Sequence, residues 1–147
     1  MKITEALIAE HGVFHGLFDY IERTVPALKT LAEVKAIAGL LDATLDPHSR
    51  VEEELFIEPL DHCMDQLGQT QGFHGEHEEI EATLDAIQQC KSAKAARKLL
   101  LEGVRACRQH FDKEERVVFP MGERLLKAKT LNALGSEWQK RRESVVW

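Results

Sequence analysis

Four long stretches of the chain carry apolar residues at alternating three- and four-residue spacing, which is the period of an amphipathic helix. None of them shows the sustained alternation that is typical of a half-buried strand. The chain has 147 residues, close to the commonest size of a single domain, and is long enough to bury a hydrophobic core. The sequence therefore predicts an all-α fold with four main helices.

Loop and breaker residues separate the four stretches. Pro47 lies inside the second stretch and removes one backbone donor, which predicts a kink there or a restart with Asp46 as N-cap. Gly12 and Gly16 lie inside the first and cost about 1 kcal/mol each relative to alanine, so a neighbour is expected close to that backbone. The predicted helices cover residues 4–23, 31–64, 73–89 and 93–127. We expect a bundle domain over residues 1–130 and a C-terminal extension over residues 131–147, a short helix or tail anchored by Trp138.

Composition narrows the class of protein. Hydrophobic residues make up 44% of the chain, but no apolar run approaches the roughly 20 residues that span a bilayer, and the first ten residues lack the apolar region of a signal peptide. The net charge of -6 gives no indication of a nucleic-acid partner. Cys63, Cys90 and Cys107 are odd in number and show no C-x-x-C spacing, which favours free thiols in a reducing compartment. We expect a cytoplasmic protein without membrane or nucleic-acid partners.

Histidines lie on the apolar stripe of every predicted main helix. The second and fourth of these helices carry a histidine followed four residues later by a glutamate, and the first and third carry pairs of histidines, with Glu81 four residues after His77 on the third. Residues three or four apart lie on one helix face, so each pair points the same way. The pairs are His11 with His15, His48 with Glu52, His74 with His77, and His110 with Glu114.

Buried imidazoles and carboxylates are costly in a bundle core unless they have partners, and bound cations remove that cost. One histidine on an apolar stripe is more often a hydrogen-bonded core residue than a ligand, and a glutamate beside it is commonly a surface pair. The same feature on four helices favours a metal centre. Imidazole nitrogens and carboxylate oxygens suit iron, manganese or zinc, and inward-facing residues one helical turn apart build two-metal sites in bundles. His62 has no matching carboxylate and is expected at the surface.

The strongest motif is the stretch from His110 to Pro120, HFDKEERVVFP, which resembles the H-x-x-x-E-E-x-x-x-F-P signature of the hemerythrin-like, HHE cation-binding domains. The pairs Glu10-His11 and Glu76-His77 resemble the E-H openings of the first and third helices of that family. The resemblance covers about residues 4–127 and implies an up-down-up-down four-helix bundle. The second helix departs from the pattern, because Pro59 comes one residue later than in the family.

The resemblance also implies a non-haem centre of two iron ions, with oxo or hydroxo and carboxylate bridges, although manganese or zinc would suit the same donors. Glu52 is preferred to Glu53 as a bridge, because Glu53 would point about 100° away from the helix stripe. His15 and His74 are further candidates, and different subtypes of the centre would use one or the other. The ligands carried over from the family are His11, His48, Glu52, His77, His110 and Glu114.

The function that this resemblance implies is binding or sensing of oxygen or a related small oxidant, a diatomic gas or peroxide, at the metal. Two alternatives stay open at the level of sequence. One is an enzyme or repair protein that acts on peroxide, nitric oxide or iron centres. The other is a regulatory module that responds to iron or oxygen. Self-association into a homo-oligomer is possible as well.

Overall fold

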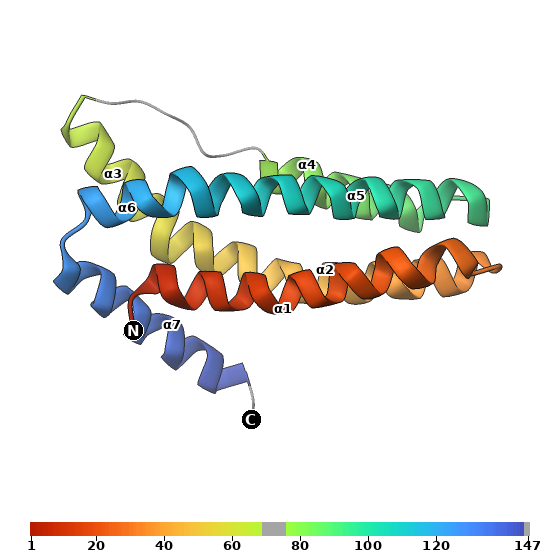
Figure 1. Ribbon diagram of the computed structural model, residues 1–147, viewed down its shortest axis with the longest axis horizontal. Coiled ribbons are helices and arrows are strands. Elements are labelled where there is room, and N and C mark those ends of the chain that lie inside the picture. The colour runs from red at the N-terminus through yellow and green to blue at the C-terminus, as the bar shows by residue number, and fades with distance from the viewer. Residues whose placement is uncertain (69–75, 146–147) are drawn as a thin grey trace. The chain divides into compact units, whose positions relative to one another are not determined.

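The computed structural model describes residues 1–68 and 76–145, and Figure 1 shows helices and their connections throughout these ranges, without a strand. The predicted all-α class is confirmed. No helix within the described ranges is long and apolar enough to span a bilayer. The α-helices are α1 (Ile3–Thr24), α2 (Leu31–Glu52), α3 (Glu58–Gln66), α4 (Glu76–Gln88), α5 (Ala93–Lys113), α6 (Phe119–Leu125) and α7 (Ala128–Val145), and the other turns are a 3-10 turn (Val25–Ala27) and two π-helical segments (Glu53–Ile57 and Glu114–Val118).

The chain forms two compact units. Unit 1 comprises Met1–His11, His48–Phe73 and Lys113–Trp147. Unit 2 comprises Gly12–Pro47 and His74–Asp112. Each unit has its own hydrophobic core, so each can be understood from the residues that it buries.

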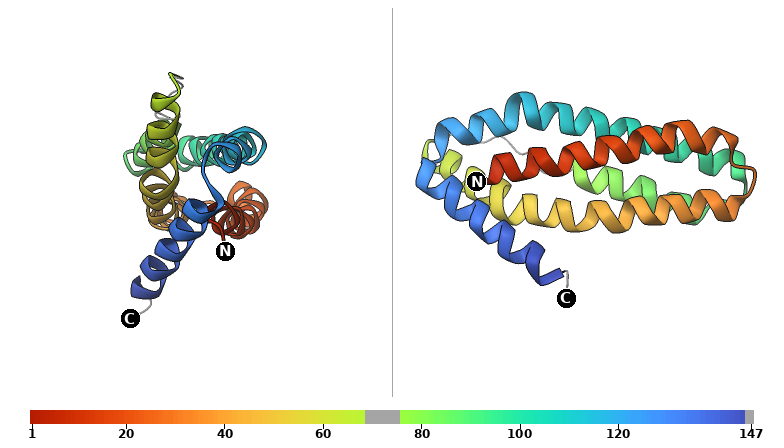
Figure 2. Two further views of the ribbon diagram at one scale, coloured as in Figure 1. Left: turned by 90° about the vertical axis from the view of Figure 1, so that its left-hand side faces the viewer. Right: turned by 60° about the horizontal axis from the view of Figure 1, so that its bottom comes forward.

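Unit 2 contains four antiparallel helical segments, from α1, α2, α4 and α5. Figures 1 and 2 show these segments running alternately up and down beside one another, as the predicted bundle topology requires. The apolar stripes that the sequence shows face a common core, which includes Phe14, Phe18, Leu41, Leu84 and Leu100. Ser92 accepts a hydrogen bond from the backbone N–H of Ala95 and so caps the start of α5.

Unit 1 is built from the start of α1, the end of α2, both π-helical segments and the helices α3, α6 and α7. Its core includes Leu7, Phe56, Leu60, Phe119 and Leu131. Residues 131–145 of the predicted C-terminal extension belong to α7, an 18-residue helix that packs on this core through Leu131, Leu134 and Trp138. Trp138 is therefore an anchor of the extension, as predicted.

Two π-helical segments interrupt the predicted second and fourth helices. In each segment, the N–H of the following residue donates to the carbonyl of the segment's first residue, five positions back. A proline follows closely in both cases, Pro59 and Pro120, at the start of the next α-helix, where its missing N–H is tolerated. Short π segments of this kind are frequent at functional sites.

Pro47 lies inside a continuous α-helix. The helix α2 continues through Pro47 to Glu52, so the restart with Asp46 as N-cap is wrong. The departure from α-helical hydrogen bonding begins six residues after Pro47, in the Glu53–Ile57 segment.

The expectation for the α1 glycines is also wrong. Among the described residues, no atom outside the local helix lies within 4 Å of a Cβ placed on Gly12 or Gly16. The close approaches occur in unit 1 instead. A Cβ on Gly122 would overlap the ring of Phe56, and a Cβ on Gly135 would overlap the backbone carbonyl of Met1. Gly135 thus lets α7 lie directly against the N-terminal residues of the chain.

Candidate metal centre

Unit 1 buries four of the predicted metal ligands. His11 comes from α1, His48 and Glu52 lie one turn apart on α2, and Glu114 opens the second π-helical segment. Their exposed fractions are 0% for His11, 2% for His48, 0% for Glu52 and 2% for Glu114. One potential ligand atom from each of His11, His48 and Glu52 lies within 4.8 Å of the others. The predicted preference for Glu52 over Glu53 agrees with this burial, because Glu53 is only half-buried.

The Nε2 atoms of the two histidines face carboxylate oxygens. The distance from Nε2 to Oε2 of Glu52 is 3.9 Å for His11 and 3.6 Å for His48, and Nε2 of His11 lies 3.5 Å from Oε1 of Glu114. These separations exceed the roughly 2.7–3.2 Å of ordinary N–H···O hydrogen bonds. Two ligand atoms that each lie about 2.1 Å from one ion are separated by roughly 3–4 Å. The donor set therefore fits a bound cation.

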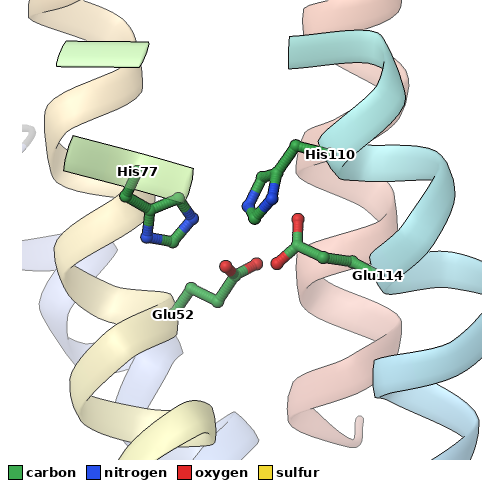
Figure 3. A group of neighbouring side chains, drawn as sticks. All are labelled: Glu52, His77, His110 and Glu114. Carbon is green, nitrogen blue, oxygen red and sulfur yellow. The ribbon is translucent and has the colours of Figure 1, made fainter. Parts of the chain in front are cut away.

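Glu52 and Glu114 point their carboxylate groups toward each other (Figure 3). Both side chains are almost fully buried. Two facing buried carboxylates cannot both remain ionised at low cost unless a cation or a shared proton lies with them. This pair is the clearest indication of a metal in unit 1, since a carboxylate can bridge two ions.

In both His11 and His48, the other ring nitrogen is held by a further glutamate. Nδ1 of His48 lies 2.6 Å from Oε2 of Glu10, and Nδ1 of His11 lies 3.2 Å from Oε1 of Glu115. An ionised carboxylate only accepts hydrogen bonds, so Nδ1 must donate and the lone pair of Nε2 is left for a metal. Outer carboxylates of this kind fix the tautomer and orientation of histidine ligands.

Glu10 is a carboxylate at neutral pH. Burial raises its pKa, but hydrogen bonds from His48 and Arg142 outweigh burial and lower the pKa to about 2. Glu10 therefore acts as an acceptor for both groups.

Unit 2 places two further predicted ligands side by side. The rings of His77 on α4 and His110 on α5 lie with centroids 4.5 Å apart, in an edge-to-face arrangement (Figure 3). The Nε2 atoms of both are buried. Nδ1 of His110 is hydrogen-bonded to the carboxylate of Glu76, so this histidine has the same kind of outer support as His11 and His48.

The remaining histidines differ from these. His15 in unit 2 is half-buried, and its Nδ1 accepts a hydrogen bond of 3.0 Å from Arg108. Its ring packs edge-on against Phe18 and Phe111. His74 lies outside the described residues, so a ligand role for His15 or His74 stays a prediction. His62 is exposed, as expected, and lies beside Gln66.

Sequence reasoning missed the role of Glu10, Glu76 and Glu115, which hydrogen-bond to the Nδ1 atoms of the candidate histidine ligands. Each is adjacent in sequence to a predicted ligand but supports a ligand on another helix. A neighbour in sequence points about 100° around the helix, toward an adjacent helix, and the spacing alone does not show which ligand it meets. The pairs are Glu10 with His48, Glu115 with His11, and Glu76 with His110.

Comparison with known families gives one cation-binding family. The family model described as the hemerythrin HHE cation-binding domain matches residues 2–122, with an overlapping second match over residues 69–137. Searches of curated proteins and of solved structures find no match. The family match spans most of the chain, and the buried histidines and glutamates form groups able to hold a metal ion. The chain therefore belongs to the hemerythrin HHE cation-binding domain family.

Proposed function

We propose that the protein holds two non-haem iron ions and uses them to bind or sense oxygen or a related small oxidant. Membership of a cation-binding family supports the metal, and the chemistry of the donors supports iron, with manganese and zinc as the competing ions. The proposed ligands are those that the family resemblance implies: His11, His48, Glu52 and Glu114 in unit 1, and His77 and His110 in unit 2.

The observation that carries this proposal is the facing pair Glu52 and Glu114 in unit 1. These carboxylates are the proposed bridges between the two ions.

The chain's own residues prepare this chemistry in two ways. Outer carboxylates hold Nε2 of His11, His48 and His110 ready as ligand atoms. Apolar rings limit the access of water: the ring of Phe119 lies 5.5 Å from that of His11 in unit 1. A reduced di-iron centre with an open coordination position would bind oxygen, peroxide or nitric oxide.

The reducing cytoplasm is the proposed location, because iron must be reduced to bind oxygen. The state of the cysteines fits such a compartment, since Cys63, Cys90 and Cys107 are all free.

The test is to purify the protein without air, measure iron per chain and record the visible spectrum while oxygen is admitted and removed. Bands that form and disappear reversibly with oxygen support the proposal. Sustained consumption of peroxide or nitric oxide would favour the enzymatic alternative, and an iron-free protein from iron-replete cells would contradict the proposal. The exposed His62 provides a matched control, because His62→Ala leaves all of the proposed ligands in place.

A further inference from the structure

Glu10 lies between the C-terminal helix and a proposed metal ligand, all within unit 1. Its Oε2 lies 2.6 Å from Nδ1 of His48 on α2. Its Oε1 accepts two hydrogen bonds from α7, one of 2.9 Å from Nε1 of Trp138 and one of 2.6 Å from Nε of Arg142. One carboxylate thus connects α7 with the imidazole of His48.

The two oxygens of Glu10 have different partners. Both donors of α7 meet Oε1, while Oε2 is directed at His48. Three donors from two helices restrict the rotation of this side chain, and the guanidinium of Arg142 also lies over the Trp138 ring at 5.9 Å. The carboxylate is therefore fixed in the orientation that keeps Nδ1 of His48 a donor and Nε2 a ligand.

The helix α7 is held by several contacts within unit 1. Leu131 is buried, and Gly135 lies against Met1. Arg141, next to Arg142, pairs instead with Glu54. The position of Trp138 and Arg142 thus depends on contacts spread along the helix.

We infer that α7 positions His48 for metal binding by holding Glu10, and that Trp138 and Arg142 are positioning residues of the proposed centre. The inference rests on the proposed function, because it takes His48 as a ligand. Loss of an outer partner of a metal-bound histidine typically weakens metal binding about 10- to 100-fold. A displacement of α7 would therefore weaken metal binding even though every ligand residue stays the same.

The decisive variant is Glu10→Gln, because glutamine offers one oxygen where Glu10 uses two. The two donors of α7 would hold that oxygen, and the amide NH2 would then face His48. An NH2 group only donates, so His48 would have to accept at Nδ1 and carry its proton on Nε2, the proposed ligand atom. We expect the apparent Kd for Co²⁺, used as an air-stable probe, to rise about 10- to 100-fold.

A second variant shows whether α7 positions Glu10 or only stabilises the fold. It removes the two α7 donors in the Glu10→Gln protein. In the combined variant Glu10→Gln, Trp138→Phe, Arg142→Met, the amide is released from α7 and can turn its oxygen to His48. We expect Co²⁺ binding to recover by about tenfold relative to Glu10→Gln alone, and the visible bands of bound Co²⁺ to return toward those of the wild type. If α7 only stabilised the fold, the added changes would weaken binding further or leave it unchanged, and that result would overturn the inference.

Arg141→Met is the matched control, since Arg141 is adjacent to Arg142 but is not bonded to Glu10. Its ion pairs are partly exposed, so its loss should alter the Kd by no more than about twofold. It should also give no recovery in the Glu10→Gln background. Recovery with Arg141→Met equal to that of the combined variant would contradict a specific role for Trp138 and Arg142.

A second measurement separates this inference from the proposed function. The ¹⁵N shifts of the His48 ring in the metal-free protein report which nitrogen carries the proton. We expect the proton on Nδ1 in the wild type, on Nε2 in Glu10→Gln, and again on Nδ1 in the combined variant. The same tautomer in all three would overturn the inference even if metal binds, whereas the expected series in a protein that takes up no metal would overturn the proposed function alone.

Discussion

His11 of α1 and His48 of α2 direct their Nε2 atoms at the same oxygen of Glu52, at 3.9 and 3.6 Å. The two histidines are 37 positions apart in sequence (48 − 11), yet their ring centroids lie 5.1 Å apart inside unit 1. Such convergence of two imidazoles on one buried carboxylate is costly for a core without a cation. It is the arrangement that metal binding requires.

Replacement of a proposed histidine ligand should reduce metal binding without loss of the fold. His48→Ala removes one nitrogen donor, and we expect less metal per chain than in the wild type after the same anaerobic purification, measured by elemental analysis. His62→Ala should leave the metal content unchanged, because His62 is exposed. Equal losses in the two variants would show that the effect is not local to the donor set.

Glu52→Gln should stabilise the metal-free protein while impairing its metal binding. The amide keeps the shape of the side chain but cannot ionise, so it removes the cost of placing two buried carboxyl groups face to face without a metal. We expect the free energy of unfolding in the presence of a chelator to rise by about 1–3 kcal/mol. Urea unfolding of both chains measures this difference. A metal-free Glu52→Gln protein less stable than the wild type would mean that the carboxylate stabilises the fold without any metal.

Glycine positions with different surroundings should respond in opposite ways to the same change. Gly135→Ala places a Cβ against the carbonyl of Met1, so we expect a loss of about 1–3 kcal/mol from overpacking. Gly16→Ala meets open space on the helix α1 and should add up to about 1 kcal/mol. Thermal and urea unfolding distinguish these outcomes. Destabilisation by Gly16→Ala equal to that by Gly135→Ala would argue against the close docking of α7.

Cys107 should be chemically inert in the folded protein. Its side chain is 0% exposed, and burial raises the pKa of its thiol to about 12, so almost no thiolate forms at pH 8. Iodoacetamide at that pH should label the half-buried Cys63 and Cys90 first, and Cys107 only after unfolding. Mass spectrometry of peptides locates the label. Rapid labelling of Cys107 in the native protein would contradict this prediction.

Much of the donor set could be predicted from sequence because helix periodicity fixes which residues share a face. The choice of Glu52 over its neighbour Glu53 followed from an angle of about 100° between successive side chains. The burial of His11, His48 and Glu114 likewise follows from their places on apolar stripes. These predictions needed only local geometry.

The contacts between helices could not be predicted in this way. Glu10 supports His48 rather than its own neighbour His11, and it does so together with α7, whose docking depends on packing between distant segments. The α1 glycines failed as indicators of close packing for the same reason, since the sequence does not show which neighbour a helix face meets. A restart at Asp46 was one of the two predictions for Pro47, but α2 continues through this residue, and the π-helical segment lies nearer Pro59.

The central claim is that the buried glutamates exist to hold paired metal ions, and the metal content of matched proteins tests it most directly. Wild-type protein and Glu114→Ala should be purified side by side without air from iron-replete cells, with iron, manganese and zinc measured per chain. We predict two iron ions per wild-type chain and fewer than two metal ions in Glu114→Ala, because one proposed bridge is lost. Equal metal content in the two proteins, or no bound metal in the wild type, would contradict this account.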